Sequence, residues 1–176
     1  MMLRRAVAPI AILIFTAVLS SCGESGKSRD YAVPSSLCGT SIGTDALDPF
    51  FPSGQNISTS ADDDAGIKSC QVTVDNTVVM TTTQVWLERG QTTAYFAQGI
   101  SLEKLDHSFD DNRFRYSDTE AFGKTRTCVD DEYDQELYTA VQVSDSDHKD
   151  AEAMKQVIVA YTGEVEESAE CAEGSS

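Results

Sequence analysis

The chain of 176 residues has few of the side chains from which catalytic and metal sites are usually built. It has only two histidines, His107 and His148, and none of its five cysteines lies in a Cys-x-x-Cys pair. A zinc site is therefore a poor interpretation, because the ligand spacing that such sites use is missing. No Gly-x-Ser-x-Gly segment occurs either, so the sequence has no nucleophile elbow of the hydrolase type. We expect no cofactor and no metal.

The two histidines support only an alternative hypothesis, that of an enzyme without a recognisable motif. His107 stands beside Ser108 in a polar stretch, and His148 falls in the first turn of a predicted helix. Neighbours in sequence do not make a catalytic triad, which is defined in space. Both histidines fit a solvated surface better, so we predict that the protein is not an enzyme.

Basic residues are scarce. Lys and Arg number 13 against 29 Asp and Glu, which gives a net charge of −16. Such a surface repels nucleic acid and anionic headgroups, because phosphate contacts need Lys and Arg. We therefore exclude a nucleic-acid partner. Solubility is the simpler meaning of the charge, and a cationic partner stays open.

The acidic residues form three clusters, but none has the spacing of a known calcium loop. They are Asp62–Asp64, Asp106–Asp111 and Asp145–Asp150. An EF-hand loop needs a glycine at position six and a glutamate at position twelve. Asp145-Ser146-Asp147 is better explained as a helix cap. A module that responds to divalent cations is kept as a further alternative.

Long apolar runs are limited to one, at the start of the chain. Residues 6–19 supply about 14 apolar positions, fewer than the roughly 20 that cross a hydrocarbon core. Arg4 and Arg5 precede this run, and small polar residues follow it. This layout is typical of a secretory signal peptide.

The small residues end directly on a cysteine. Leu19-Ser20-Ser21-Cys22 resembles the lipobox of bacterial lipoproteins. The resemblance implies that the Cys22 thiol receives a diacylglycerol, that residues 1–21 are removed, and that the protein sits on the outer, extracytoplasmic face of the cell membrane. The remaining 155 residues would carry 11 basic and 29 acidic side chains, a net charge of −18. We expect residues 22–30 to be a flexible tether and residues 31–176 to form a single domain.

Four further cysteines remain, and in an exported chain they predict two disulfides, with three possible connectivities. We favour the pairing without nested loops, Cys38–Cys70 with Cys128–Cys171. Each loop would span about 30 to 45 residues and contribute on the order of 3–4 kcal/mol in the chain-entropy model.

Hydrophobic periodicity predicts an α+β domain, an antiparallel sheet with a long C-terminal helix packed on one face. The predicted strands are 55–60, ended by Asp62–Gly66, then a hairpin of 67–75 and 77–87, and then 113–116, 121–129 and 136–144. Residues 106–112 are expected to be a polar connection. Predicted helices begin at Thr92 or Thr93, with an interruption at Gly99, and at Asp145 or Ser146, with the last one ending near Cys171.

Trp86 is predicted to lie on the face of its strand opposite Val85 and Leu87, because side chains alternate along a strand. We assign Val85 and Leu87 to the core. This makes the surroundings of Trp86 a possible interaction surface, with an exposed apolar patch or groove.

A second resemblance covers most of the chain after Cys22. Residues 31–39, 70–75 and 115–119 and the helix ending at Cys171 are together similar to small, functionally uncharacterised actinobacterial lipoproteins. This resemblance implies the fold and the anchor but no activity. The leading hypothesis is a non-enzymatic, lipid-anchored module that binds an envelope protein, a wall component or a small ligand.

Overall fold

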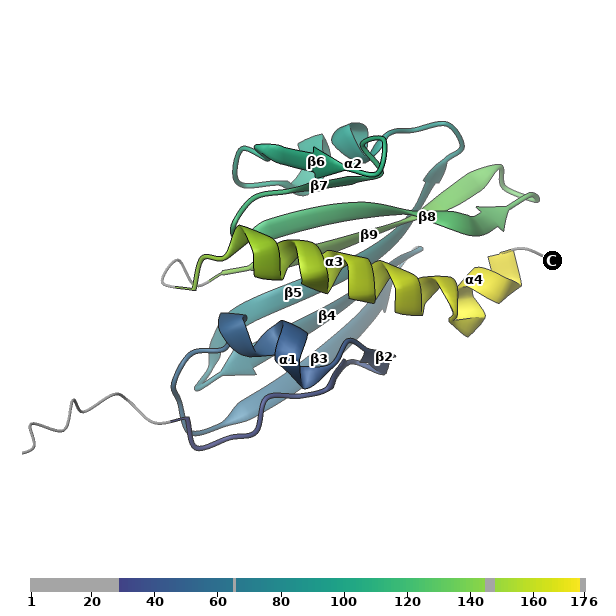
Figure 1. The fold of residues 1–176 in the computed structure, drawn as a ribbon. Coiled ribbons are helices and arrows are strands. Elements are labelled where there is room, and N and C mark those ends of the chain that lie inside the picture. The colour runs from purple at the N-terminus through teal and green to yellow at the C-terminus, as the bar shows by residue number, and fades with distance from the viewer. Residues whose placement is uncertain (1–28, 65, 145–147, 175–176) are drawn as a thin grey trace, which may run out of the picture.

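The computed structural model describes residues 29–64, 66–144 and 148–174. Its main feature is an antiparallel sheet with a helix across one face (Figure 1). In chain order the elements are β1 (Ser36–Leu37), β2 (Thr40–Ser41), α1 (Thr44–Leu47), a 3-10 turn (Asp48–Phe50), β3 (Ile57–Asp64), β4 (Ile67–Val74), β5 (Thr77–Glu88), α2 (Thr93–Ile100), β6 (His107–Phe109), β7 (Phe114–Tyr116), β8 (Glu120–Asp130), β9 (Gln135–Val143), α3 (Ala151–Glu166) and α4 (Ala169–Gly174).

Seven strands form the main sheet in the order β3-β4-β5-β9-β8-β7-β6, with every neighbouring pair antiparallel. The predicted hairpin is confirmed as β4 and β5. Its turn residues Asp75 and Asn76 both have positive φ, 46° and 67°, a conformation that Asp and Asn tolerate better than most side chains.

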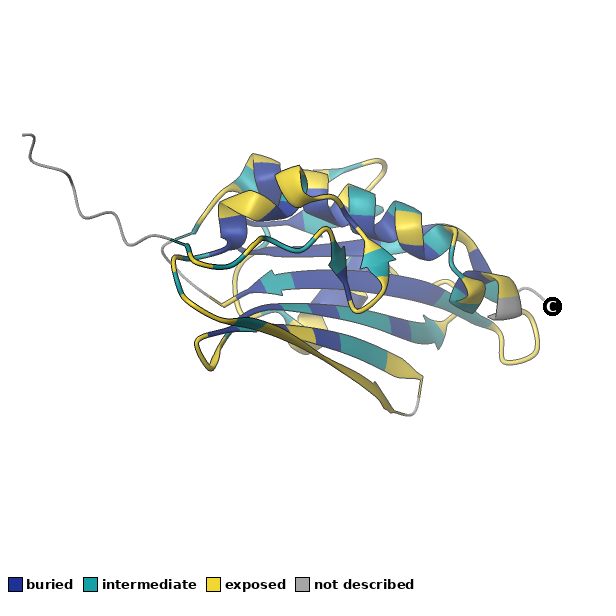
Figure 2. Cartoon of the chain, turned by 90° about the horizontal axis from the view of Figure 1, so that it is seen from below, coloured by how far each residue is buried: buried dark blue, intermediate teal, exposed yellow. Residues whose placement is uncertain are grey.

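Helix α3 packs across the sheet, and this packing builds the larger core (Figure 2). Its apolar stripe repeats every three or four residues, and all of it is buried: Met154, Val157, Ile158, Tyr161 and Val165. Inward side chains of β4, β5, β8 and β9 meet this stripe. The prediction of an antiparallel sheet with a C-terminal helix on one face is confirmed.

The C-terminal helix is shorter than predicted. Helix α3 has 16 residues and is capped by Asp150, whose side chain accepts a hydrogen bond from the amide of Ala153. The cap was expected at Asp145 or Ser146, and residues 145–147 lie outside the described residues. Helix α3 ends at Glu166. The Ser168 hydroxyl then donates a hydrogen bond to the carbonyl of Val165, and the chain continues into α4.

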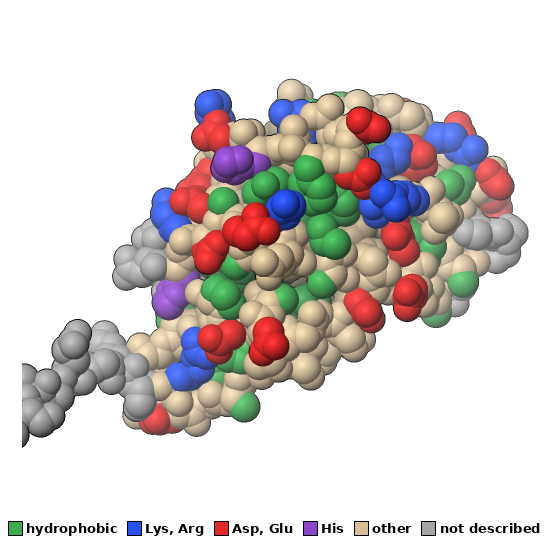
Figure 3. Space-filling model, viewed as in Figure 1, with side chains coloured by type: hydrophobic (Ala, Val, Ile, Leu, Met, Phe, Trp, Pro, Cys, Tyr) green, Lys and Arg blue, Asp and Glu red, His purple; other side chains and the backbone are tan. Residues whose placement is uncertain are grey.

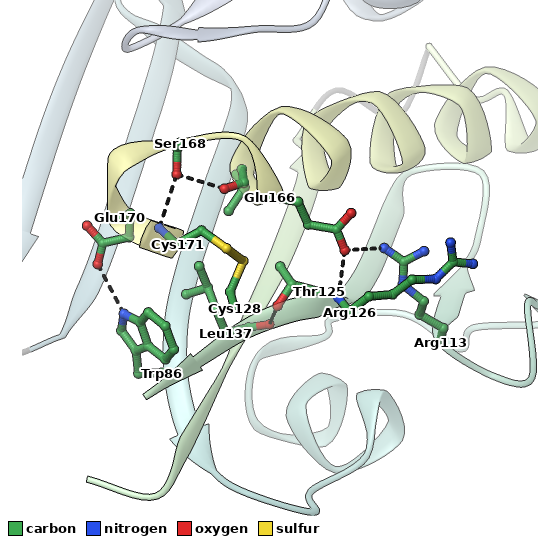
Figure 4. The surroundings of a disulfide bond; sticks show 11 residues. Trp86, Arg113, Thr125, Arg126, Cys128, Leu137, Glu166, Ser168, Glu170 and Cys171 are labelled. Atoms are coloured by element: carbon green, nitrogen blue, oxygen red, sulfur yellow. Dashed lines mark hydrogen bonds and ion pairs between the residues drawn. A yellow bond between two sulfur atoms is a disulfide. The ribbon is translucent and has the colours of Figure 1, made fainter. Parts of the chain in front are cut away.

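Both disulfides have the pairing that we favoured. Cys38–Cys70 joins the turn of the β1–β2 hairpin to β4, and Cys128–Cys171 joins β8 to α4. Figure 4 shows the second bond, with α4 held against the end of the sheet.

Two predicted connections are strands instead. Strand β3 does not end before Asp62. It continues to Asp64, because Asp62 and Asp63 pair with Ser69 and Lys68 of β4. Within the polar stretch 106–112, His107–Phe109 forms β6, whose Phe109 ring stacks on Phe114 of β7 at 4.7 Å. Pairing partners outweighed local polarity at both places.

The last two residues of the predicted tether contact the domain. The Arg29 guanidinium bonds to the Asp48 carboxylate and to the carbonyl of Phe51, and the amide of Asp30 donates to the carbonyl of Gly54. No helix among the described residues combines the length and apolarity needed to cross a membrane.

Candidate apolar groove beside helix α2

Helix α2 lies on the face of the sheet opposite α3. Its Phe96 ring packs edge-on against Phe122 of β8 and Tyr138 of β9, at centroid distances of 5.6 and 5.7 Å. The neighbours Ala121 and Leu137 point the other way, into the core under α3. A small second core therefore anchors one side of α2 to the sheet.

Hydrogen bonds hold the start of α2 in place. The Thr92 side chain caps the helix by accepting from the amide of Tyr95. In the preceding loop, the Glu136 carboxylate accepts from the amide of Gly90 at 2.8 Å and pairs with Lys124. Burial alone would raise the pKa of Glu136, but the bonds from Lys124 and Gly90 lower it. The Glu136 carboxylate therefore stays ionised and fixes the entry to α2.

An open groove runs between α2 and the sheet beside this anchor, with a volume of about 610 Å³. We call it the α2 groove. Its lining comes from the exposed half of α2 and from strands β4, β5 and β9: Ile67, Thr83, Val85, Leu87, Tyr95, Phe96, Gln98, Gly99, Ile100 and Gln142.

The α2 groove exposes apolar surface to an unusual degree. Ile67 is 48% exposed, Tyr95 55% and Ile100 37%, and these are three of the six large hydrophobic side chains exposed among the described residues. Single exposed apolar residues are normal, whereas a contiguous group commonly marks a binding site. On the outer surface of the α3 side, charged side chains of both signs are scattered among the apolar ones (Figure 3).

A buried carboxylate holds the C-terminal end of α2. Glu120 is 2% exposed and accepts hydrogen bonds from the amides of Leu102 and Glu103, the hydroxyl of Ser101 and the side-chain amide of Gln142. The Gln142 amide also donates to the carbonyl of Ile100, at 3.1 Å. The C-terminal end of α2 is thereby tied to β8 and β9.

Gly99 leaves part of the α2 groove empty. A Cβ atom added at this position would meet no other atom within 4 Å, and Gly99 does not have a positive φ. A larger side chain here would therefore project into the groove without a clash at its root.

Trp86 is not on the open face. It lies under α3 and α4, is half-buried against the larger core, and donates a hydrogen bond from its indole nitrogen to Glu170 (Figure 4). Val85, which we assigned to the core, is buried in the smaller core under α2, and Leu87, assigned likewise, packs against that core. Both side chains also line the α2 groove. The alternation was correct, but the Trp86 face of β5, which we predicted to be open, is covered by α3 and packs against the larger core. Ile67 is the cross-strand partner of Val85. An apolar residue at this position of β4 is the sequence feature that indicates an apolar groove on the Val85 face.

The two histidines contact different parts of the molecule. The His107 ring stacks on Tyr116 at 5.0 Å, and Nδ1 of His148 lies 3.2 Å from the carbonyl of Pro49. Ser117 lines a cleft together with His107. The Ser117 hydroxyl accepts hydrogen bonds from the amides of Thr119 and Glu120 and thereby stabilises the turn before β8.

Basic side chains lie close to members of the first two acidic clusters, and Asp150 of the third caps α3. Asp110 pairs with Arg113 and Arg126, and Asp106 pairs with Lys104. Asp63 lies 3.8 Å from Lys68. Among residues 29–64, 66–144 and 148–174, no group of three or more His, Cys, Asp or Glu side chains has an arrangement that could hold a metal ion.

Comparisons of the chain with protein-family models, with curated proteins and with solved structures find no match. A binding function is therefore inferred from the geometry of the α2 groove alone.

Proposed function

We propose that this protein is a lipid-anchored binding module on the extracytoplasmic face of the cell membrane, and that it holds its ligand or partner in the α2 groove. The observation that carries the binding function is the groove itself. It joins three exposed apolar side chains to a rigid sheet floor, and its volume of about 610 Å³ falls within the roughly 300–1,000 Å³ of small-molecule sites.

The location rests on separate arguments. The lipobox-like segment ending at Cys22 supports the anchor, and two disulfides are typical of a protein that folds in an oxidising compartment. We propose a binding role without catalysis, because Ser117, the hydroxyl that shares a cleft with His107, is used in a turn.

The anchor is tested by mass spectrometry of the full chain produced in bacteria and recovered from membranes. We expect a mature protein that starts at Cys22 and carries the mass of a diacylglycerol, and a Cys22→Ala chain without that mass. A mature wild-type protein without lipid would contradict the anchor.

The binding function is tested with the same membranes after mild crosslinking. The Gly99→Leu variant fills the α2 groove, whereas Gly163→Leu is its matched control: Gly163 is also a helical glycine with open space around its Cβ, but it lies in α3. We expect a crosslinked or co-purified molecule with wild type and with Gly163→Leu, and its loss with Gly99→Leu. Equal recovery with all three chains would contradict the assignment of the groove.

A further inference from the structure

The lining of the α2 groove has no charged side chain among the described residues that form it, although 24% of the chain is Asp, Glu, Lys or Arg. The chain as a whole carries a net charge of −16. An anionic ligand would meet this negative field with no Lys or Arg in the groove to offset it. A cationic ligand would find no carboxylate lining the groove and would lose its hydration without a partner.

The floor of the groove offers side chains and not backbone. Strand β5, which supplies Thr83, Val85 and Leu87, is hydrogen-bonded on both sides, to β4 and to β9. A peptide strand therefore cannot pair with it, because strand addition needs a free sheet edge. Binding at this floor depends on apolar contact.

The polar side chains of the groove are neutral, and one of them is already engaged. The amide nitrogen of Gln142 donates to Glu120 and to the carbonyl of Ile100. Thr83, Gln98 and the hydroxyl of Tyr95 are the other polar groups of the lining. This set offers only neutral hydrogen-bonding groups and no charge pairing.

We propose that the α2 groove binds one uncharged apolar small molecule, either an alkyl chain or a flat ring system, with Ile67, Tyr95 and Ile100 as the contact surface and Gly99 as the residue that leaves room for it. This inference rests on the proposed binding function and adds the chemical class of the ligand. Burial of apolar area drives the binding, and the missing charges set the selectivity.

The test uses two fluorescent probes with one skeleton and different charge. N-phenyl-1-naphthylamine is neutral, and 8-anilinonaphthalene-1-sulfonate is its anionic counterpart. Both are titrated into a protein that begins at residue 22 and carries Cys22→Ala. Without the lipid this protein needs no detergent, and it is exported so that its disulfides form. We expect saturable binding of the neutral probe and an affinity for the sulfonate that is about tenfold or more weaker.

The groove variants locate the binding. We expect Gly99→Leu to weaken the affinity for the neutral probe by about tenfold or more, and Gly163→Leu to leave that affinity unchanged. Displacement by a fatty alcohol would identify an alkyl-chain ligand, and displacement by a planar aromatic hydrocarbon alone would identify a ring ligand. Equal affinity for both probes, no binding of the neutral probe, or no effect of Gly99→Leu would overturn the proposal.

These outcomes are separable from failure of the binding function. If the neutral probe does not bind but Gly99→Leu still removes a partner from the membrane crosslinking, the ligand class is wrong and the binding function stands. If both experiments show no dependence on Gly99, both proposals fail.

Discussion

The indole nitrogen of Trp86 donates a hydrogen bond to Oε1 of Glu170 at 3.0 Å, and this bond joins β5 to α4 (Figure 4). The same carboxylate pairs with Lys68 of β4. The Cys128–Cys171 disulfide is one residue further along the chain. Helix α4 is thus attached to three strands, and the single tryptophan of the protein reports on that attachment.

Acid should release this attachment. Burial would raise the pKa of Glu170, but the hydrogen bonds from Lys68 and Trp86 lower it below its ordinary value. A carboxylate with a lowered pKa stabilises the fold fully above the unfolded-state value of about 4.3, and this stabilisation is lost as the pH falls through the lower folded-state pKa. We expect the Trp86 emission to shift to the red below about pH 4.

The control is Glu170→Gln, which keeps an oxygen that accepts from Trp86 but does not titrate. Its emission should stay constant until the whole domain unfolds, as followed by far-UV circular dichroism. Superimposable fluorescence curves for wild type and Glu170→Gln would contradict the assignment.

Loss of the Cys128–Cys171 disulfide should destabilise the domain and loosen α4. The two cysteines are 43 residues apart in sequence, so the Cys128→Ser/Cys171→Ser chain should lose about 2–4 kcal/mol of unfolding free energy. Urea denaturation measures the loss, and the Trp86 emission of the folded state should move as well. Cys38→Ser/Cys70→Ser is the comparison, since it should lower stability without changing that emission.

Glu120→Ala should be among the most damaging single substitutions near the α2 groove. It leaves the amides of Leu102 and Glu103 without their acceptor, and a buried unsatisfied donor costs about 1–3 kcal/mol. We expect a loss of about 3 kcal/mol in urea denaturation and weaker binding of the neutral probe, because Gln142 also loses its acceptor. Unchanged stability would show that the carboxylate does not hold this end of α2.

Two glycines should respond in opposite directions to alanine. A Cβ at Gly123 of β8 would lie 2.7 Å from the Thr162 hydroxyl and 2.9 Å from that of Thr139, two groups that are hydrogen-bonded to each other. Gly123→Ala should therefore cost about 1–3 kcal/mol by forcing α3 from the sheet. Gly163→Ala meets open space and should gain up to about 1 kcal/mol from helix propensity. Thermal unfolding of both variants checks the signs.

Local patterns predicted much of the fold. The hairpin of β4 and β5 follows from alternating apolar residues on either side of Asp75-Asn76, and α3 follows from an apolar stripe that repeats every three or four residues. The strand pairing of Asp62–Asp64 could not be read in this way, because an edge strand that is exposed along most of its length carries no apolar alternation.

The candidate site was harder to predict than the elements around it. Both faces of β5 carry large apolar side chains, with Met80 and Trp86 on one face and Val85 and Leu87 on the other. Alternation states which residues share a face, but it does not state which face a distant helix covers. The assignment of Trp86 to the open face was wrong for this reason.

The sequence by itself determined most of the local elements and the absence of a recognised catalytic motif, because each depends on residues near one another along the chain or on composition. It left three disulfide connectivities open, and the structure has the one that we favoured. Only the tertiary structure decided that α3 covers the Trp86 side of β5 and that α2 shields just part of the other side. That choice depends on the packing of α3 and of Phe96 against strands far away in sequence. The α2 groove is the part of the second face that α2 leaves uncovered.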